Sequence, residues 1–385
     1  MRGMWATLLL LAAPTLAPAE SWSVDRLPFP LESGWLFRRG HDPAWSSPFR
    51  EKTHWQPIRV TGPWERQGFR GYNGHAWYRL TFQLPSRFAA ETLGVDLGTL
   101  GDVDEVFLNG QRIGSSGSFP PLYEPATLKR RIYRLPRVSL RYGEFNELSV
   151  HVYNEGRFGG FLGPPPVLDR YETLLARQTG RDVVLWVGAA FLAVLALFHG
   201  ALSLFYGGGR EQWPWVTFLL IFAGYQITYA SFGPGLWWGS GFAFRLNVIA
   251  LLLAVGTFAL VIASQTRGPI PTPAVVFASV MGVGAGFAAL WRRSVDLYLW
   301  VYFAELAILV LVALALWWFF RQKRSGRAWT LVLASVPFFA TVLLDVAVDL
   351  CLLPRPGRGL LLLYSSLGVV PFALAMSVTL TTRWA

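Results

Sequence analysis

Five ionisable side chains lie inside long apolar stretches of the C-terminal half, where a charge is costly and therefore informative. They are His199, Arg245, Glu305, Asp345 and Asp349. Asp345 and Asp349 are four residues apart, so they share one face of a helix. Groups of this kind form ion pairs, transfer protons or bind a polar ligand away from bulk water.

Seven apolar segments must position these groups. Each is close to the length of about 20 residues that a helix needs to span a bilayer, and tryptophans gather at the segment ends as an interfacial belt. The segments are residues 183–206, 213–232, 242–264, 273–291, 297–320, 329–353 and 360–380. The sequence predicts an all-α seven-helix transmembrane bundle over residues 183–380, with a tail at 381–385.

Composition agrees with a membrane protein. Hydrophobic residues make up 53% of the 385 and charged residues only 15%, and the mean hydropathy is +0.38. A net charge of +11 would also suit nucleic acid, but the apolar content favours a membrane and we expect no nucleic-acid partner. The single cysteine, Cys351, excludes a disulfide framework and any multi-thiolate zinc site.

The N-terminus predicts export. Arg2, a short apolar run over residues 5–13 and small residues at Ala17 and Ala19 are typical of a signal peptide, residues 1–19. An uncleaved anchor helix is the alternative. Seven crossings from an exported N-terminal domain put the C-terminus in the cytoplasm. The short loops and tail on the cytoplasmic side would then hold seven Lys and Arg residues, compared with four in the exterior loops, which is the direction that the positive-inside rule expects. We expect a bacterial inner (plasma) membrane protein with its N-terminal domain in the periplasm or outside the cell.

Depth along the helices predicts which intramembrane groups meet. At about 1.5 Å of rise per residue, Arg245 and Asp349 lie about 5 and 6 Å from the outer surface, and Glu305 and Asp345 about 12 Å. We expect an Arg245–Asp349 ion pair beside an acidic cavity between the third, fifth and sixth segments. Two interpretations stay open: a site that holds a ligand or communicates with the exported domain, and a structural pair with protonated acids.

Residues 20–166 have the period-two pattern of short strands. Between two such runs, Asn109-Gly110 favours a type I′ hairpin turn, because both residues tolerate positive φ. In residues 76–82, alternation places Tyr78, Leu80 and Phe82 on a core face. The opposite face, with Trp77 and Arg79, either meets a ligand or packs under a loop. The pattern predicts an exported all-β jelly roll or β-sandwich.

The order of several motifs in this region resembles a known family. The motifs are WQPIRV at 55–60, GPW at 62–64, GY at 71–72, AWYR at 76–79 and VFLNG at 106–110. This order is similar to the N-terminal, galactose-binding-like sugar-binding domain of family 2 glycoside hydrolases. Sugar recognition needs an aromatic ring beside hydrogen-bonding groups, so the candidate ligand-binding residues are Trp64, Tyr72, Asn73 and Arg79.

The closing motifs look like a second family. LSVHVYN at 148–154, GG at 159–160 and LG at 162–163 resemble the extracellular domain of bacterial seven-transmembrane receptors with diverse intracellular signalling modules, the 7TMR-DISM family. That resemblance implies a jelly roll directly before seven helices, and a cytoplasmic output module such as a kinase or cyclase. Between the two parts, an apolar stripe that begins at Leu168 predicts a linker helix over residues 167–182, broken at Gly180.

Catalysis is not expected. A glycosidase needs two carboxylates flanking the bond it cleaves, and we interpret Asp102, Asp104 and Glu105 as a solvated strand edge instead. The histidines of the exported domain are His41, His54, His75 and His151. They show no metal-ligand spacing, so we expect neither a metal site nor a cofactor.

The sequence therefore predicts a membrane receptor. It would bind an extracytoplasmic carbohydrate or cell-wall fragment and relay binding through the helices to a cytoplasmic signalling partner, an output module or a second copy of the chain. The alternative is a carbohydrate-binding anchor or transporter accessory protein that does not signal. Proton-coupled transport through Glu305 and Asp345 also stays open, although no internal repeat supports it.

Overall fold

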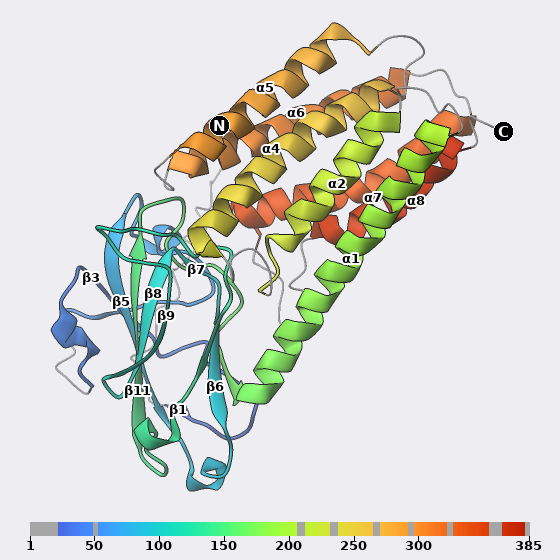
Figure 1. Cartoon of the computed structure of the whole chain (residues 1–385). Coiled ribbons are helices and arrows are strands. Elements are labelled where there is room, and N and C mark those ends of the chain that lie inside the picture. The colour runs from blue at the N-terminus through green and yellow to red at the C-terminus, as the bar shows by residue number, and fades with distance from the viewer. Residues whose placement is uncertain are drawn as a thin grey trace, which may run out of the picture.

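The computed structural model describes residues 22–48, 53–205, 212–231, 238–264, 270–291, 296–321, 326–353 and 364–381. The predicted signal peptide, most of the loop residues used for the charge count and the last four residues of the tail lie outside these ranges. A β-sandwich stands at one end of a bundle of helices (Figure 1). The predicted order, an all-β domain before an all-α one, is confirmed.

The larger sheet of the sandwich is built around two long antiparallel strands, β5 (Gly74–Gln83) and β11 (Phe145–Asn154). Its strand order is β4 (Gln56–Pro57), β3 (Leu36–Arg39), β5, β11, β8 (Val103–Leu108) and β9 (Gln111–Ser116), and β1 (Trp22–Ser23) runs parallel to β5. The predicted Asn109-Gly110 turn is confirmed. It joins β8 to β9, pairs Leu108 with Gln111 and has φ of 51° and 85° at its two residues.

The second sheet has the order β10 (Arg131–Arg134), β6 (Leu93–Gly98), β13 (Val167–Arg170) and β2 (Phe29–Pro30). The short strands β7 (Leu100–Gly101) and β12 (Gly160–Phe161) pair at the side that faces the helices. In the described part of the sandwich, 3-10 turns lie in the connections at η1 (Pro43–Ser46), η2 (Trp64–Gln67), η3 (Ser86–Phe88) and η4 (Arg137–Ser139).

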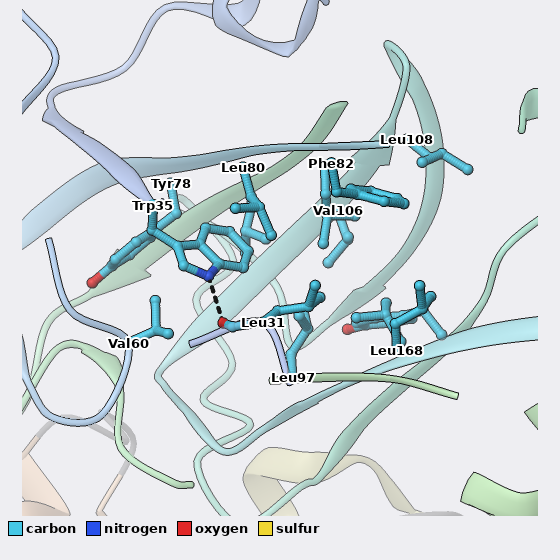
Figure 2. Close-up of a cluster of buried hydrophobic side chains, with 14 of the residues drawn as sticks. Leu31, Trp35, Val60, Tyr78, Leu80, Phe82, Leu97, Val106, Leu108 and Leu168 are labelled. Atoms are coloured by element: carbon cyan, nitrogen blue, oxygen red, sulfur yellow. Dashed lines mark hydrogen bonds between the residues drawn. The ribbon is translucent and has the colours of Figure 1, made fainter. Parts of the chain in front are cut away.

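The apolar core lies between the two sheets (Figure 2). Tyr78, Leu80 and Phe82 of β5 point into it, as alternation predicts, and they meet Leu97 and Leu168 from the second sheet. The indole Nε1 of Trp35 donates to the carbonyl of Leu31 at 2.8 Å, so this buried polar atom has its partner.

A helix lies in each of the seven predicted apolar segments. The helices are α1 (Tyr171–Phe205), α2 (Trp213–Ile227), α4 (Ser240–Ser264), α5 (Thr272–Leu290), α6 (Leu297–Arg321), α7 (Gly326–Asp349) and α8 (Tyr364–Thr381). Among the described residues, four helices are long and apolar enough to cross a membrane: α1, α4, α5 and α6. Contacts between the rings of Phe218, Phe258, Phe338 and Phe372 join α2, α4, α7 and α8 in the bundle core.

The predicted linker helix needs correction. Residues 167–170 form strand β13, because Val167 and Leu168 pair with both β6 and β2 inside the sandwich. From Tyr171 onward the chain is a single helix, α1, which runs through Gly180 without a break. One glycine costs a helix only about 1 kcal/mol relative to alanine, so the long run of helix-forming residues around it prevails. The sandwich is thus joined to the bundle by a continuous helix rather than a hinge (Figure 1).

Candidate functional site: the junction between sandwich and helices

The buried carboxylate of Asp102 lies at the centre of the contact between sandwich and helices. Within the sandwich, its oxygens accept from the hydroxyl of Tyr123 at 2.7 Å, the hydroxyl of Thr127 at 2.9 Å and the backbone N–H of Glu155 at 3.2 Å. From helix α6, the hydroxyl of Tyr298 donates to Asp102 Oδ1 at 2.6 Å. Four donors fill the accepting capacity of a carboxylate, which is what a buried charge requires.

A second polar contact lies deeper in the bundle. Arg157, on the loop between β11 and β12, places its guanidinium Nη2 2.5 Å from Glu305 Oε2 of α6. Both side chains are less than 10% exposed. The guanidinium also lies over the ring of Tyr302, 4.3 Å from its centroid. An arginine of the sandwich therefore pairs with an acid that lies well inside a predicted membrane segment.

Two further contacts tie α4 and α7 to the sandwich. Glu124 Oε1 accepts from the backbone N–H of Gly241 at 2.9 Å, in the first turn of α4, where helix amides lack partners. A Cβ at Gly241 would lie 2.8 Å from the Glu124 side chain, so a larger residue there would require Glu124 to move and would disturb this contact. Arg66 donates to the carbonyl of Leu350, just past α7, at 3.3 Å. We call these contacts, together with those of Asp102 and Arg157, the junction.

A cavity of about 140 Å³ lies within the junction. We call it the junction cavity. Its lining combines sandwich residues such as Thr99 and Arg130 with Asn247 of α4 and with Asp345 and Asp349 of α7. A second cavity of about 90 Å³ lies within the bundle, and it is lined by the same two aspartates and by Glu305. Charged groups of both signs thus face a space that both parts of the chain enclose.

The structure bears on the predicted intramembrane set in two ways. Glu305 of α6 and Asp345 and Asp349 of α7 line one cavity together with residues of α4, as the depths suggested. The expected Arg245–Asp349 pair is wrong: among the described residues Arg245 has no carboxylate partner and donates only to the carbonyl of Ala289, at 3.4 Å. Depth fixes how far along a helix a residue lies, but not the direction in which its side chain points.

The predicted sugar-binding residues do not form a surface. Trp64 is fully buried in the sandwich core, where its ring packs on Phe37 and Tyr72. Arg79 is 1% exposed and pairs with the equally buried Glu147 at 3.1 Å. Tyr72 is half-buried against the core, and Asn73 is exposed and accepts from Asn154. Trp64 and Arg79 therefore offer a ligand no accessible face.

The opposite face of β5 is covered by a loop, the second of the two alternatives that the pattern left open. Trp77 is 1% exposed and packs beneath Trp45 and Trp55. Arg79 donates to the carbonyl of Trp45 at 2.8 Å.

The predicted solvated strand edge is also corrected. Asp102 and Asp104 are buried, and only Glu105 is partly exposed. Asp104 accepts from Arg131 at 2.7 Å and from the hydroxyl of Tyr133 at 2.5 Å, both from β10. Sequence reasoning missed these partners because they lie 27 and 29 residues away. The two aspartates were themselves a signal, because carboxylates in a strand-like run must either face water or accept hydrogen bonds from other side chains.

The loop that carries Arg157 is fixed at its other end by Glu65. Both oxygens of this carboxyl group accept from the backbone N–H of Gly159, at 3.0 and 3.2 Å. Burial raises the pKa of Glu65 to about 7, although the hydrogen bond from Gly159 acts in the opposite direction. The anchor of the loop therefore changes charge near neutral pH.

Comparison with known proteins gives limited matches. No family model matches the chain, and no curated protein matches it. Similar solved structures include a glycosyl hydrolase family 2 member from Bacteroides cellulosilyticus (18% identity, 36% of this chain, 20% of that chain, TM-score 0.30). A Bacteroides uniformis β-glucuronidase is 19% identical over 36% of this chain and 17% of that chain, with a TM-score of 0.31. A β-glucuronidase from Ruminococcus gnavus is 15% identical over 40% of this chain and 32% of that chain, also with a TM-score of 0.31. This chain thus spans a third or less of each of these structures.

Proposed function

We propose that the chain is a membrane receptor whose ligand site is the junction cavity. A ligand bound there would touch the sandwich and the helices at once, so its binding would depend on how the two parts are docked. The observation that carries this proposal is the cavity itself, enclosed on one side by Thr99 and Arg130 and on the other by Asn247, Asp345 and Asp349.

The lining suits a small polar ligand. It combines guanidinium, carboxyl, hydroxyl and amide groups with the aromatic rings of Phe158, Tyr229 and Phe244. Sugars present an apolar C–H face and a polar rim, which is the combination that such a lining recognises. A carbohydrate or cell-wall fragment is therefore the ligand class we propose, at the junction rather than at the buried Trp64 and Arg79.

Relay through the helices follows from differential affinity. A ligand shifts an equilibrium between two docked arrangements only when it binds one of them more tightly. The junction contacts reach α4 at Gly241, α6 at Tyr298 and Glu305, and the end of α7 at Leu350. A change of docking would therefore move several helices together towards a cytoplasmic output module or partner.

The same proposal includes the membrane arrangement. Seven crossings would leave the sandwich on the periplasmic or outer side and the C-terminus in the cytoplasm. The sandwich contacts the start of α4, the start of α6 and the end of α7, as an up-and-down bundle requires. We propose no enzymatic activity for the described part of the chain, because the buried aspartates Asp102 and Asp104 already accept from neighbouring side chains.

Cys351 gives a direct test. It is the only cysteine of the chain and it lines the junction cavity. The full chain, purified in detergent, would be treated with a small maleimide in the presence of monosaccharides, oligosaccharides and peptidoglycan fragments. We expect one of these classes to slow the alkylation of Cys351 in a saturable way.

A pair of matched variants controls the test. Val348 lines the junction cavity, whereas Val283 is 60% exposed on α5. Val348→Phe should fill the cavity and weaken binding at least tenfold, and Val283→Phe should leave it unchanged. Protection that survives Val348→Phe would contradict the location of the site. Ligand binding with no change in the cytoplasmic ends of the helices would favour the anchor without signalling.

A further inference from the structure

Three histidines that are far apart in the sequence converge on the outer face of the larger sheet. His41 follows β3, His75 lies near the start of β5 and His151 lies in β11. His151 Nε2 is 3.2 Å from His41 Nδ1 and 3.0 Å from His75 Nδ1. One ring nitrogen from each residue lies within 4.8 Å of the other two. We call these residues the histidine cluster. The sequence predicted separate, ordinary histidines at these positions.

The three rings form a nearly regular triangle. Their centroids are 4.7 Å apart for His41 and His75, 4.8 Å for His41 and His151, and 5.1 Å for His75 and His151. Three imidazoles bound to one tetrahedral zinc ion, with Zn–N bonds of about 2.0–2.1 Å, have their ring centroids about 5.2 Å apart. The spacing of the rings is therefore already close to the spacing around a metal.

Hydrogen bonding alone does not account for the convergence. A neutral imidazole carries one donor and one acceptor, and its acceptor nitrogen has a single lone pair in the ring plane. His151 Nε2 faces two ring nitrogens at hydrogen-bonding distance, so a proton on one of them leaves the other without a comparable partner. A cation at the centre is a partner for all three nitrogens at once.

The surroundings hold His151 in the orientation that a metal ligand needs. Its ring is stacked between Trp77 and Phe119, with both centroid distances 4.5 Å. Its second nitrogen, Nδ1, faces the Glu105 carboxylate at 3.8 Å, and Glu105 is in turn paired with Arg112 at 3.1 Å. At 3.8 Å this contact is longer than a hydrogen bond, but the negative charge behind Nδ1 favours the tautomer with the proton on that nitrogen, which directs the lone pair of Nε2 towards a metal.

We propose that the histidine cluster binds one divalent transition-metal ion through His41, His75 and His151, with zinc as the ion whose geometry fits best. Imidazole ligands also accept copper and nickel. His41 is exposed whereas His151 is buried, so a fourth coordination position faces solvent and accepts water or an exogenous ligand. The proposal does not depend on the junction cavity, because none of the three histidines lines it.

The test uses cobalt(II) as a spectroscopic probe and zinc as the competitor. The full chain would be purified in detergent without a histidine tag, treated with a chelator and titrated with cobalt(II). We expect one equivalent to bind, with the visible absorption of a four-coordinate cobalt centre, and zinc to displace it. Carboxylates that hydrogen-bond a ligand typically contribute about 10–100-fold to metal affinity; since Glu105 lies 3.8 Å from His151, Glu105→Gln should weaken zinc binding by no more than about tenfold.

His41→Gln is the decisive variant, because its side chain is exposed and its loss should not prevent folding. It should weaken zinc binding more than Glu105→Gln does and abolish the cobalt spectrum. His54→Gln is the matched control, since His54 is also exposed but lies outside the cluster, and it should bind as the parent does. Unchanged zinc affinity in His41→Gln, or a parent chain that takes up no cobalt and no zinc, would overturn the proposal.

Discussion

The hydroxyl of Tyr298, one residue into α6, donates to the buried carboxylate of Asp102 in the sandwich at 2.6 Å. The two residues are 196 positions apart in the chain. The Tyr298 ring also fills the space next to Gly156, where an added Cβ would lie 2.2 Å from ring atom Cε2. One tyrosine thus joins the two parts by hydrogen bonding and by packing, and Asp102 holds both the loop at Glu155 and the helix.

Tyr298→Phe should weaken the junction without a change of shape. The phenyl ring would keep the packing against Gly156, but Asp102 would lose one of its four donors. A hydrogen bond to a charged group contributes about 1.5–3 kcal/mol, so the free energy of unfolding should fall by that amount. Thermal unfolding followed by tryptophan fluorescence measures the loss. Alkylation of Cys351 should also become faster as the junction opens.

Tyr302→Phe is the matched control for that experiment. It removes a hydroxyl from the same helix, and the remaining ring still lies under Arg157. Its stability and its alkylation rate should equal those of the parent. Equal behaviour of the two variants would mean that the Asp102–Tyr298 hydrogen bond contributes nothing to docking.

Arg157→Met and Glu305→Leu should each destabilise the protein more than their combination does. Removal of one partner leaves a buried charge without compensation, which costs about 3–5 kcal/mol, whereas replacement of both by apolar groups is often neutral. The double-mutant cycle is measured by thermal unfolding of the full chain in detergent. Additive losses would contradict a coupled pair.

Arg245→Met should destabilise the protein much less than Arg157→Met. The sequence alone predicts the opposite order, because it pairs Arg245 with Asp349. Arg245 lies in α4, but it reaches only the carbonyl of Ala289, at 3.4 Å. Its replacement should change the free energy of unfolding by no more than about 0.5 kcal/mol. A loss as large as that of Arg157→Met would restore an important role for Arg245.

Local patterns in the sequence predicted the elements well. Apolar length predicted a helix in each of the seven apolar segments, and among the described residues four of these helices are long and apolar enough to cross a membrane. Alternation assigned Tyr78 and Leu80 to the core, and the Asn109-Gly110 pair located a hairpin turn. Each of these features is decided by neighbours along the chain.

The site depends on contacts across the chain, and local patterns do not contain them. Arg157 and Glu305 are 148 residues apart, so no spacing rule relates them. The histidines of the cluster lie on two strands and a loop, and only the pairing of Trp77 with His151 in the β5–β11 register brings them to one face. The prediction that Trp64 binds a ligand failed for the same reason. The density of aromatic residues suggested a binding face, whereas the ring of Trp64 is buried in the sandwich core.

Reporter fusions should test the proposed membrane arrangement. Alkaline phosphatase is active only outside the cytoplasm, so a fusion after Ala385 should be inactive and a fusion after Arg293, between α5 and α6, should be active. A cytoplasmic reporter should give the reverse pattern at both sites. Phosphatase activity after Ala385 would contradict seven crossings from an exported sandwich.

Stability should fall as pH rises through the range in which Glu65 titrates. Burial raises its pKa from 4.5 to about 7 in the folded chain, so between these values the folded state holds a proton that the unfolded state has released. The contribution is present below about pH 4.5 and is lost as pH passes 7. It amounts to less than about 3 kcal/mol, because the carboxyl group is only partly buried.

Thermal midpoints measured from pH 4.5 to 8 should show the decline, and Glu65→Gln should flatten it. Glu91→Gln is the control, because hydrogen bonding to Arg170 lowers the pKa of Glu91, so the decline should persist. A decline that persists in Glu65→Gln would assign it to another group.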